Sequence, residues 1–128
     1  MSGDGQLVLL VEDNEKNMKL ARDLLQYHGF TTVEATNAED GIVLAKERSP
    51  KLVLMDIQLP GMDGVAALEH LRGDPNTSRI PIVAMTASVM KEDRERFDKA
   101  GFDGFITKPI DVRAFPQQVR DAIAKGRA

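Results

Sequence analysis

Five residues of the sequence carry side chains that together suit phosphate chemistry. Each stands where a short, largely apolar run of the chain ends, and such runs indicate strands. In open α/β sheets the carboxyl ends of the strands form the edge where ligands bind. We therefore expect the five side chains to meet at one edge of a sheet. They are Glu12, Asp13, Asp56, Thr86 and Lys108.

The three carboxylates predict a divalent cation. Carboxylates held close together raise one another's pKa unless a cation lies between them. Such a ligand set favours a hard ion such as Mg²⁺ (or Mn²⁺), which leaves room for phosphate oxygens. Lys108 offers a positive charge and Thr86 a hydroxyl donor, and both suit a phosphoryl group. Because a carboxylate can attack phosphorus and form an acyl phosphate, the pattern predicts that Asp56 accepts a phosphoryl group with Mg²⁺.

Each of the five residues alone also fits an ordinary structural role. Asp56 could cap a helix or close a turn, and Lys108 could be a surface charge. Glu12 and Asp13 could form a solvated helix start, and Thr86 could simply end a strand. The functional interpretation depends on the position of all five residues at the ends of predicted strands, because these ends meet at the same edge of the sheet.

The elements that position these residues alternate along the chain. The predicted strands are 7–11, 30–35, 52–56, 80–85 and 104–107. The predicted helices are 15–28, 37–48, 64–72, 91–100 and a last helix that starts near 115. Strands that alternate with helices at this spacing predict an α/β fold, in which right-handed crossovers cover both faces of a parallel sheet with helices.

Composition excludes several classes of protein. The 128 residues fit one domain with a core from about 6 to 124, which leaves nothing for an effector domain. A net charge of −3 without a basic stripe argues against DNA as a partner. The sequence has no cysteine, and His28 and His70 stand far apart, so thiolate and histidine metal sites are not expected. No leader or membrane span is apparent, which predicts a cytoplasmic protein without membrane insertion.

Several motifs resemble the receiver domains of two-component response regulators. The likeness covers nearly the whole chain, and within the family the chain is similar to bacterial single-domain regulators of chemotaxis and of cell division (DivK-like). The resemblance implies the flavodoxin-like (βα)5 fold with strand order 2-1-3-4-5. The motifs are Val11-Glu12-Asp13-Asn14, Leu54-Met55-Asp56, Pro60-Gly61-Met62-Asp63-Gly64, Thr86-Ala87 and Lys108-Pro109.

The resemblance also implies a role for each site residue. Asp56 is the expected phosphoacceptor, and Asp13, Asp56 and the backbone carbonyl of Gln58 are the expected Mg²⁺ ligands. Glu12 is expected to act on the metal through water. Thr86 and Lys108 are expected to bind the phosphoryl oxygens.

Further positions follow from the same resemblance. The Lys108–Pro109 bond is expected to be cis, otherwise a minority form of X–Pro bonds. Phe105 falls at the position of an aromatic switch that works with Thr86, although it lacks the hydroxyl of the Tyr found in many relatives. Gln58 and Ser88 fall at positions that tune the lifetime of the phosphoryl group.

The expected function is a phosphorylation-dependent signalling switch rather than an enzyme with a separate substrate. The donor is expected to be a histidine kinase or a histidine phosphotransfer protein, which docks near Asn14, Asn17, Met18 and Ile110. The readout for a downstream protein is expected on the face formed by 91–100, 104–107 and the last helix. The chain is expected to catalyse its own phosphorylation and dephosphorylation, as a monomer or a weak dimer linked to phosphorylation.

Other readings remain open at this point. Within the switch class, a phosphorelay intermediate and a terminal signal carrier have the same sequence features, and a phosphorylation-independent adaptor is the alternative. A nucleotide-binding domain needs a glycine-rich loop after the first strand, where this chain has Glu12-Asp13-Asn14-Glu15. An aspartyl phosphatase usually has a second Asp two residues after the first, where this chain has Gln58.

Overall fold

The computed structural model describes residues 4–57, 59, 61–87 and 90–126. Five strands form one parallel sheet in the order β2-β1-β3-β4-β5, which confirms the predicted fold. The strands are β1 (Leu7–Val11), β2 (Thr31–Ala35), β3 (Leu52–Asp56), β4 (Ile82–Thr86) and β5 (Gly104–Thr107). The helices are α1 (Glu15–Tyr27), α2 (Ala38–Arg48), α3 (Gly64–Arg72), α4 (Lys91–Ala100) and α5 (Phe115–Lys125).

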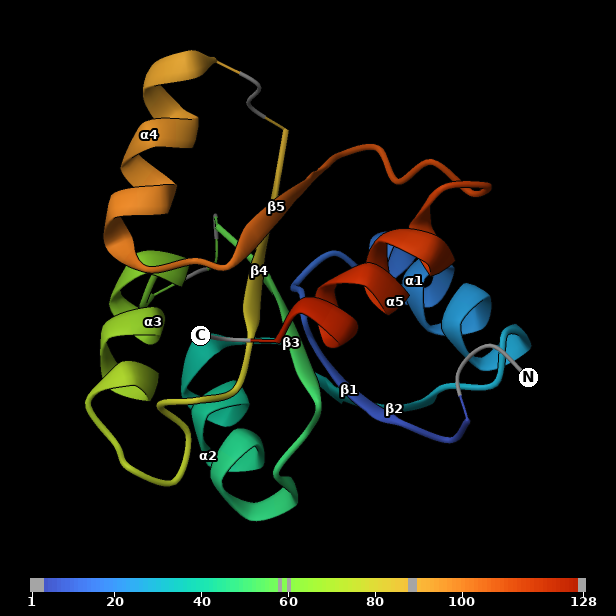
Figure 1. Ribbon diagram of the computed structural model, residues 1–128, viewed down its shortest axis with the longest axis horizontal. Coiled ribbons are helices and arrows are strands. Elements are labelled where there is room, and N and C mark those ends of the chain that lie inside the picture. Colours follow the sequence, from blue (N-terminus) through green and yellow to red (C-terminus); the bar gives the residue numbers. More distant parts are fainter. Residues whose placement is uncertain (1–3, 58, 60, 88–89, 127–128) are drawn as a thin grey trace.

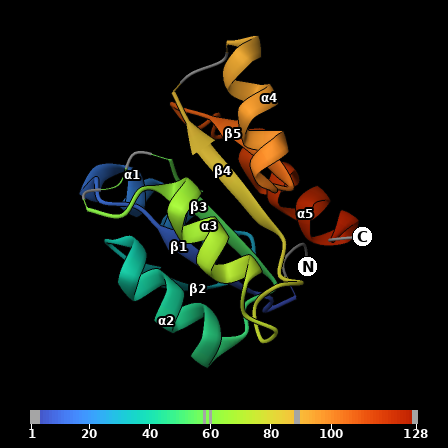
Figure 2. The ribbon, with the colours of Figure 1, turned by 90° about the vertical axis from the view of Figure 1, so that its left-hand side faces the viewer.

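The helices cover the sheet on both faces. Helices α2, α3 and α4 lie on one face, and α1 and α5 lie on the other (Figure 1). Figure 2 looks onto the first of these faces, with α2, α3 and α4 in front of the strands. This arrangement follows from alternating strands and helices joined by right-handed crossovers.

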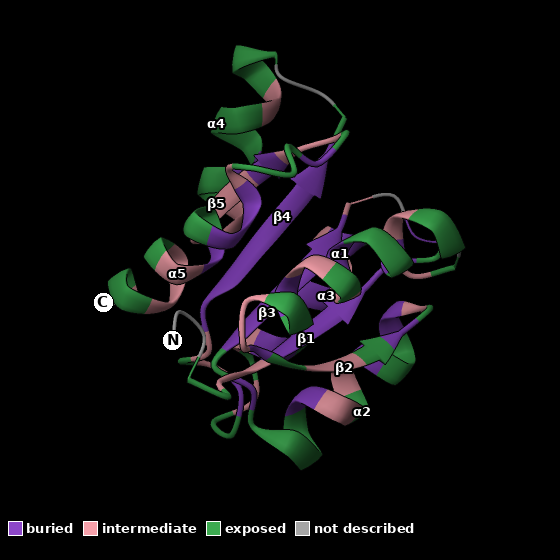
Figure 3. Ribbon diagram, turned by 90° about the vertical axis from the view of Figure 1, so that its right-hand side faces the viewer, coloured by how far each residue is buried: buried purple, intermediate pink, exposed green. Residues whose placement is uncertain are grey.

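The strand residues alternate between two hydrophobic cores. Leu9 and Val11 pack in the core beneath α2, α3 and α4, whereas Val8 and Leu10 pack in the core beneath α1 and α5. Every residue of β3 and β4 is buried, so both strands run purple through the middle of Figure 3. Continuous apolar runs are what a parallel sheet covered on both faces requires.

Strand β4 starts later than the sequence predicts. The predicted strand began at Ile80, but the structure starts it at Ile82. The amide of Ile80 donates to the Thr77 carbonyl in the preceding turn at 3.1 Å, and Pro81 has no N–H to donate. The amide of Ile82 donates to Asp103 Oδ2 at 2.8 Å, which fixes the start of the strand.

The connection after β3 is tight, and Gly64 makes it possible. A Cβ atom on Gly64 would lie 2.8 Å from the carbonyl oxygen of Asp56, closer than real Cβ atoms approach a backbone. Asp63 caps α3, because its Oδ1 accepts a hydrogen bond from the amide of Ala66 at 2.8 Å. The start of α3 is thereby held directly against the strand end that carries Asp56.

Candidate phosphate and metal site

The strand ends bring the predicted site residues together. Glu12 and Asp13 follow β1, Asp56 ends β3, Thr86 ends β4 and Lys108 follows β5. A cavity of about 550 Å³ opens at this edge of the sheet. Its lining residues are Asp13, Asn14, Asn17, Asp56, Ile57, Thr86, Ala87 and Lys108.

Three carboxylates of the site lie close enough to hold one metal ion. One oxygen each from Glu12, Asp13 and Asp56 lies within 4.8 Å of the other two. Glu12 and Asp56 are buried, at 4% and 6% exposure, whereas Asp13 is exposed. Among the described residues this is the one such group of three, and it contains no histidine. An all-oxygen set with one face open to solvent fits a hard divalent ion that retains water.

Lys108 joins two of these carboxylates. Its Nζ lies 2.9 Å from Glu12 Oε1 and 3.0 Å from Asp56 Oδ2, and its side chain is only 17% exposed. Burial by itself lowers the pKa of a lysine, but the hydrogen bonds to Glu12 and Asp56 outweigh burial and raise the pKa of Lys108. Lys108 therefore stays positively charged at the bottom of the cavity.

The positive charge of Lys108 does not fully compensate for the burial of the Glu12 carboxylate. Burial, together with the neighbouring Asp56, raises the pKa of Glu12 to about 7, against the smaller opposing effect of Lys108. Its second oxygen, Oε2, is buried and accepts no hydrogen bond from the described residues. A buried carboxylate oxygen without a donor is unfavourable, so this site fits a further cation or its bound water.

Thr86 and Phe105 lie on neighbouring strands at different depths. Thr86 is buried at 7% exposure, and Phe105 is half-buried on β5. The guanidinium carbon of Arg94, on α4, lies 5.0 Å from the centre of the Phe105 ring, within the range of a cation–π contact. The sequence gives no signal for this contact, because Arg94 belongs to a charged stretch that reads equally well as a solvated surface.

Other predicted positions have different outcomes. The Lys108–Pro109 bond is cis. Ile110 and Met18, two of the predicted docking residues, are both buried in the core beneath α1 and α5, so little of either side chain is accessible for docking. Gln58 and Ser88 lie outside the described residues.

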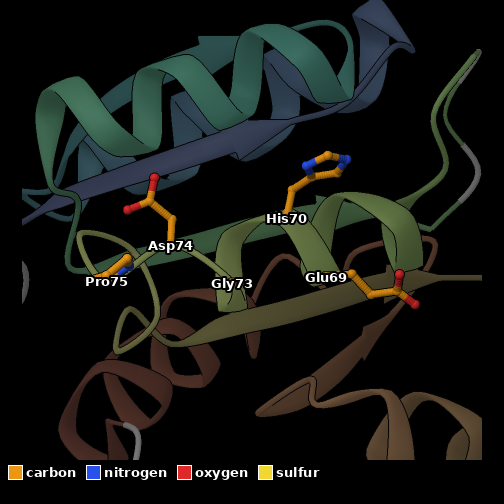
Figure 4. Close-up of a pocket in the computed structure, with 5 residues that line it drawn as sticks. All are labelled: Glu69, His70, Gly73, Asp74 and Pro75. Carbon is orange, nitrogen blue, oxygen red and sulfur yellow. The ribbon is translucent and has the colours of Figure 1, made fainter.

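A second hollow lies at the end of α3, and its residues have no comparable chemistry. Figure 4 shows the His70 side chain reaching toward α2 and Glu69 pointing away from it. Asp74 is paired with Lys46 at 3.1 Å. Because α3 runs back from the strand ends, this hollow lies at the opposite edge of the sheet. It is lined by Glu69, His70, Gly73, Asp74 and Pro75.

No helix within the described residues has the length and apolar character needed to span a membrane.

Sequence comparisons agree with this geometry. The chain matches the family model of the response regulator receiver domain over residues 8–120. It is 42% identical over 113 residues to the polar-differentiation response regulator DivK of Brucella anthropi, a match covering 88% of this chain and 92% of that protein. DivK of Brucella abortus shows the same identity and coverage.

Solved structures share the fold. The receiver domain of the sensor histidine kinase PA1611 of Pseudomonas aeruginosa, solved with a magnesium ion in its active-site cleft, superposes with a TM-score of 0.86 and 30% identity. The match covers 94% of this chain and 98% of that one. The chemotaxis protein CheY4 of Vibrio cholerae has a TM-score of 0.86 at 19% identity, over 91% of this chain and 98% of that one, a likeness of fold alone.

Proposed function

Because this chain belongs to the receiver-domain family of response regulators, we propose that Asp56 accepts a phosphoryl group from a phosphohistidine of a partner protein. Receiver domains are phosphoacceptor signalling modules. Asp56 is the proposed acceptor because it ends β3 and lines the cavity at the strand ends. The donor in this proposal is a histidine kinase or a histidine phosphotransfer protein.

The contact of Lys108 with Asp56 is the observation that carries the proposal. Burying an aspartate beside two other carboxylates is costly, and the Lys108 ammonium, with its Nζ 3.0 Å from Asp56 Oδ2, places a compensating positive charge beside the proposed nucleophile. The same ammonium, with the hydroxyl of Thr86, is placed to receive the phosphoryl oxygens in the cavity.

Glu12, Asp13 and Asp56 are the residues that would hold Mg²⁺ or Mn²⁺. The backbone carbonyl of Gln58 is a further proposed ligand, which rests on the family resemblance alone. When bound, the ion supplies positive charge against the phosphoryl oxygens. The buried, unsatisfied oxygen of Glu12 supports this assignment.

The transfer itself is carried out by groups of the chain. A carboxylate oxygen of Asp56 forms the new bond to phosphorus, and the bond from phosphorus to the histidine nitrogen of the donor breaks. The Lys108 ammonium stabilises the negative charge on the phosphoryl oxygens, and the Thr86 hydroxyl donates a hydrogen bond to one of them. Hydrolysis of the resulting acyl phosphate by water would complete autodephosphorylation.

The signal in this proposal passes from Thr86 to the surface formed by α4, β5 and α5. Movement of Thr86 toward the phosphoryl group frees space into which the half-buried Phe105 can turn. A complete switch needs about 5.5 kcal/mol of bias, and charge-assisted hydrogen bonds supply roughly 1.5–3 kcal/mol each. About two to four such bonds would therefore supply the bias needed to alter the surface that a downstream protein binds.

The proposal is tested by incubating the full chain with acetyl phosphate and Mg²⁺ and recording its intact mass. We expect the gain of one phosphoryl group, which is lost in Asp56→Asn and in EDTA. Asp63→Asn is the matched control, because Asp63 is a nearby aspartate that only caps α3. A gain that survives Asp56→Asn would contradict the assignment of the acceptor. The absence of any gain, with Mg²⁺ binding measured separately, would favour the phosphorylation-independent adaptor.

A mass measurement does not separate a relay intermediate from a terminal signal carrier. Transfer from phosphorylated Asp56 back to a histidine phosphotransfer protein would identify an intermediate.

A further inference from the structure

The cavity at the strand ends has uncharged polar side chains where it meets the start of α1. Among the described residues, those that line the cavity at the start of α1 are Asn14 and Asn17, while its charged lining residues stand at strand ends. Its volume of about 550 Å³ lies in the range of roughly 300–1,000 Å³ found for sites that hold whole small molecules. The cavity therefore has room for the group that carries the phosphoryl group as well as for the phosphoryl group.

The two asparagines at the start of α1 are not equivalent. Asn14 is exposed and caps α1, because its Oδ1 accepts a hydrogen bond from the amide of Asn17 at 3.0 Å. Asn17 is half-buried, and its side-chain amide makes no hydrogen bond to any other described residue. A half-buried amide loses part of its hydration, so a ligand that offers it a hydrogen bond is favoured.

We propose that Asn17 Oδ1 accepts a hydrogen bond from the ring N–H of the phosphohistidine donor, and thereby selects imidazole over anionic leaving groups. This inference rests on the proposed function of Asp56. The amide oxygen of Asn17 can accept a hydrogen bond from the N–H of a neutral imidazole leaving group. The amide carries no positive charge, so it does not stabilise an anionic leaving group in the same way.

The chemistry of the transfer gives this contact its effect. An oxygen of Asp56 bonds to phosphorus, the phosphorus–nitrogen bond breaks, and its electron pair remains on the nitrogen. In the reacting donor the other ring nitrogen is protonated, so the ring starts as a cation and leaves as neutral imidazole with that N–H intact. Asn17, by accepting from that N–H, orients the ring and keeps the proton in place. When acetyl phosphate is the donor, the leaving group is acetate, which has no N–H for the Asn17 oxygen to bind.

Two small donors test the proposal without the docking of a partner protein. Phosphorylation of the full chain in Mg²⁺ is followed by intact mass with monophosphoimidazole and with acetyl phosphate. We expect Asn17→Ala to lower the ratio of the two rates about fivefold, as the loss of one hydrogen bond predicts. Asn17→Asp keeps an acceptor oxygen and should retain the preference for monophosphoimidazole. Asn76→Ala is the matched control, because it makes the same truncation in an exposed loop at the opposite edge.

The results that overturn the proposal are distinct. If Asn17→Ala slows both donors equally, or leaves the ratio as in the wild type, Asn17 does not recognise the leaving group. If the wild type reacts with neither donor, or Asp56→Asn still reacts, the proposed function itself fails. Thermal unfolding of each variant shows whether a loss of rate reflects a loss of structure.

Discussion

Glu12 is expected to destabilise the metal-free protein at neutral and higher pH. Burial raises the pKa of Glu12 from 4.5 to about 7, so the folded protein binds more protons than the unfolded chain between these values. The free energy of unfolding must then fall as the pH rises through this window. At roughly 1.36 kcal/mol per pKa unit, the difference corresponds to about 3 kcal/mol above pH 7.

Glu12→Gln replaces the carboxylate by a neutral group of the same shape. At pH 8 in EDTA we expect the variant to be about 3 kcal/mol more stable than the wild type, which is roughly 10 °C in Tm. At pH 4 the advantage should nearly disappear, because Glu12 is then protonated in the folded state and mostly protonated in the unfolded state. The attraction of Lys108 does not reverse the sign, because it is already included in the raised pKa of Glu12.

Urea unfolding from pH 4 to pH 8 measures this effect, with and without Mg²⁺. Mg²⁺ should stabilise the wild type more than the variant, because the ion binds the folded state through Glu12 among others. Glu47→Gln is the matched control, since Glu47 is exposed on α2. If Glu12→Gln is less stable than the wild type at pH 8 in EDTA, the ion pair with Lys108 outweighs the burial of Glu12, and the reasoning is refuted.

Two further changes test how the fold supports the site. Gly64→Ala puts a Cβ atom 2.8 Å from the carbonyl oxygen of Asp56. We therefore expect the free energy of unfolding to fall by about 1–3 kcal/mol and phosphorylation by acetyl phosphate to be slower. Wild-type stability and rate in this variant would show that the backbone shifts without cost. Phe115→Ala empties a fully buried position at the start of α5 and should cost about 3–5 kcal/mol in urea unfolding, with the phosphoacceptor chemistry retained in the folded fraction. A cost below about 1 kcal/mol would mean that the core collapses around the missing ring.

The elements were predictable because their signals are local. Continuous apolar runs such as 52–55 indicate buried strands, and the helices begin after Asn14, Asn37 and Asp63, which are residue types that favour the N-cap. The start of β4 was missed by two residues, because it depends on Asp103, which is far along the chain. The order of the strands followed from the family resemblance rather than from any local pattern.

The sequence by itself determined which residue types close each strand, and hence a set of carboxylates, a lysine and a threonine suited to phosphate chemistry. Only the tertiary structure decided how these groups meet. Lys108 reaches Glu12 across 96 positions of sequence, and Arg94 lies over Phe105 from a different element. Asn17 lines the same cavity, and its side-chain amide makes no hydrogen bond to another described residue. Such contacts depend on sheet order and helix packing, because residues far apart in sequence are brought within reach only when the whole fold has formed.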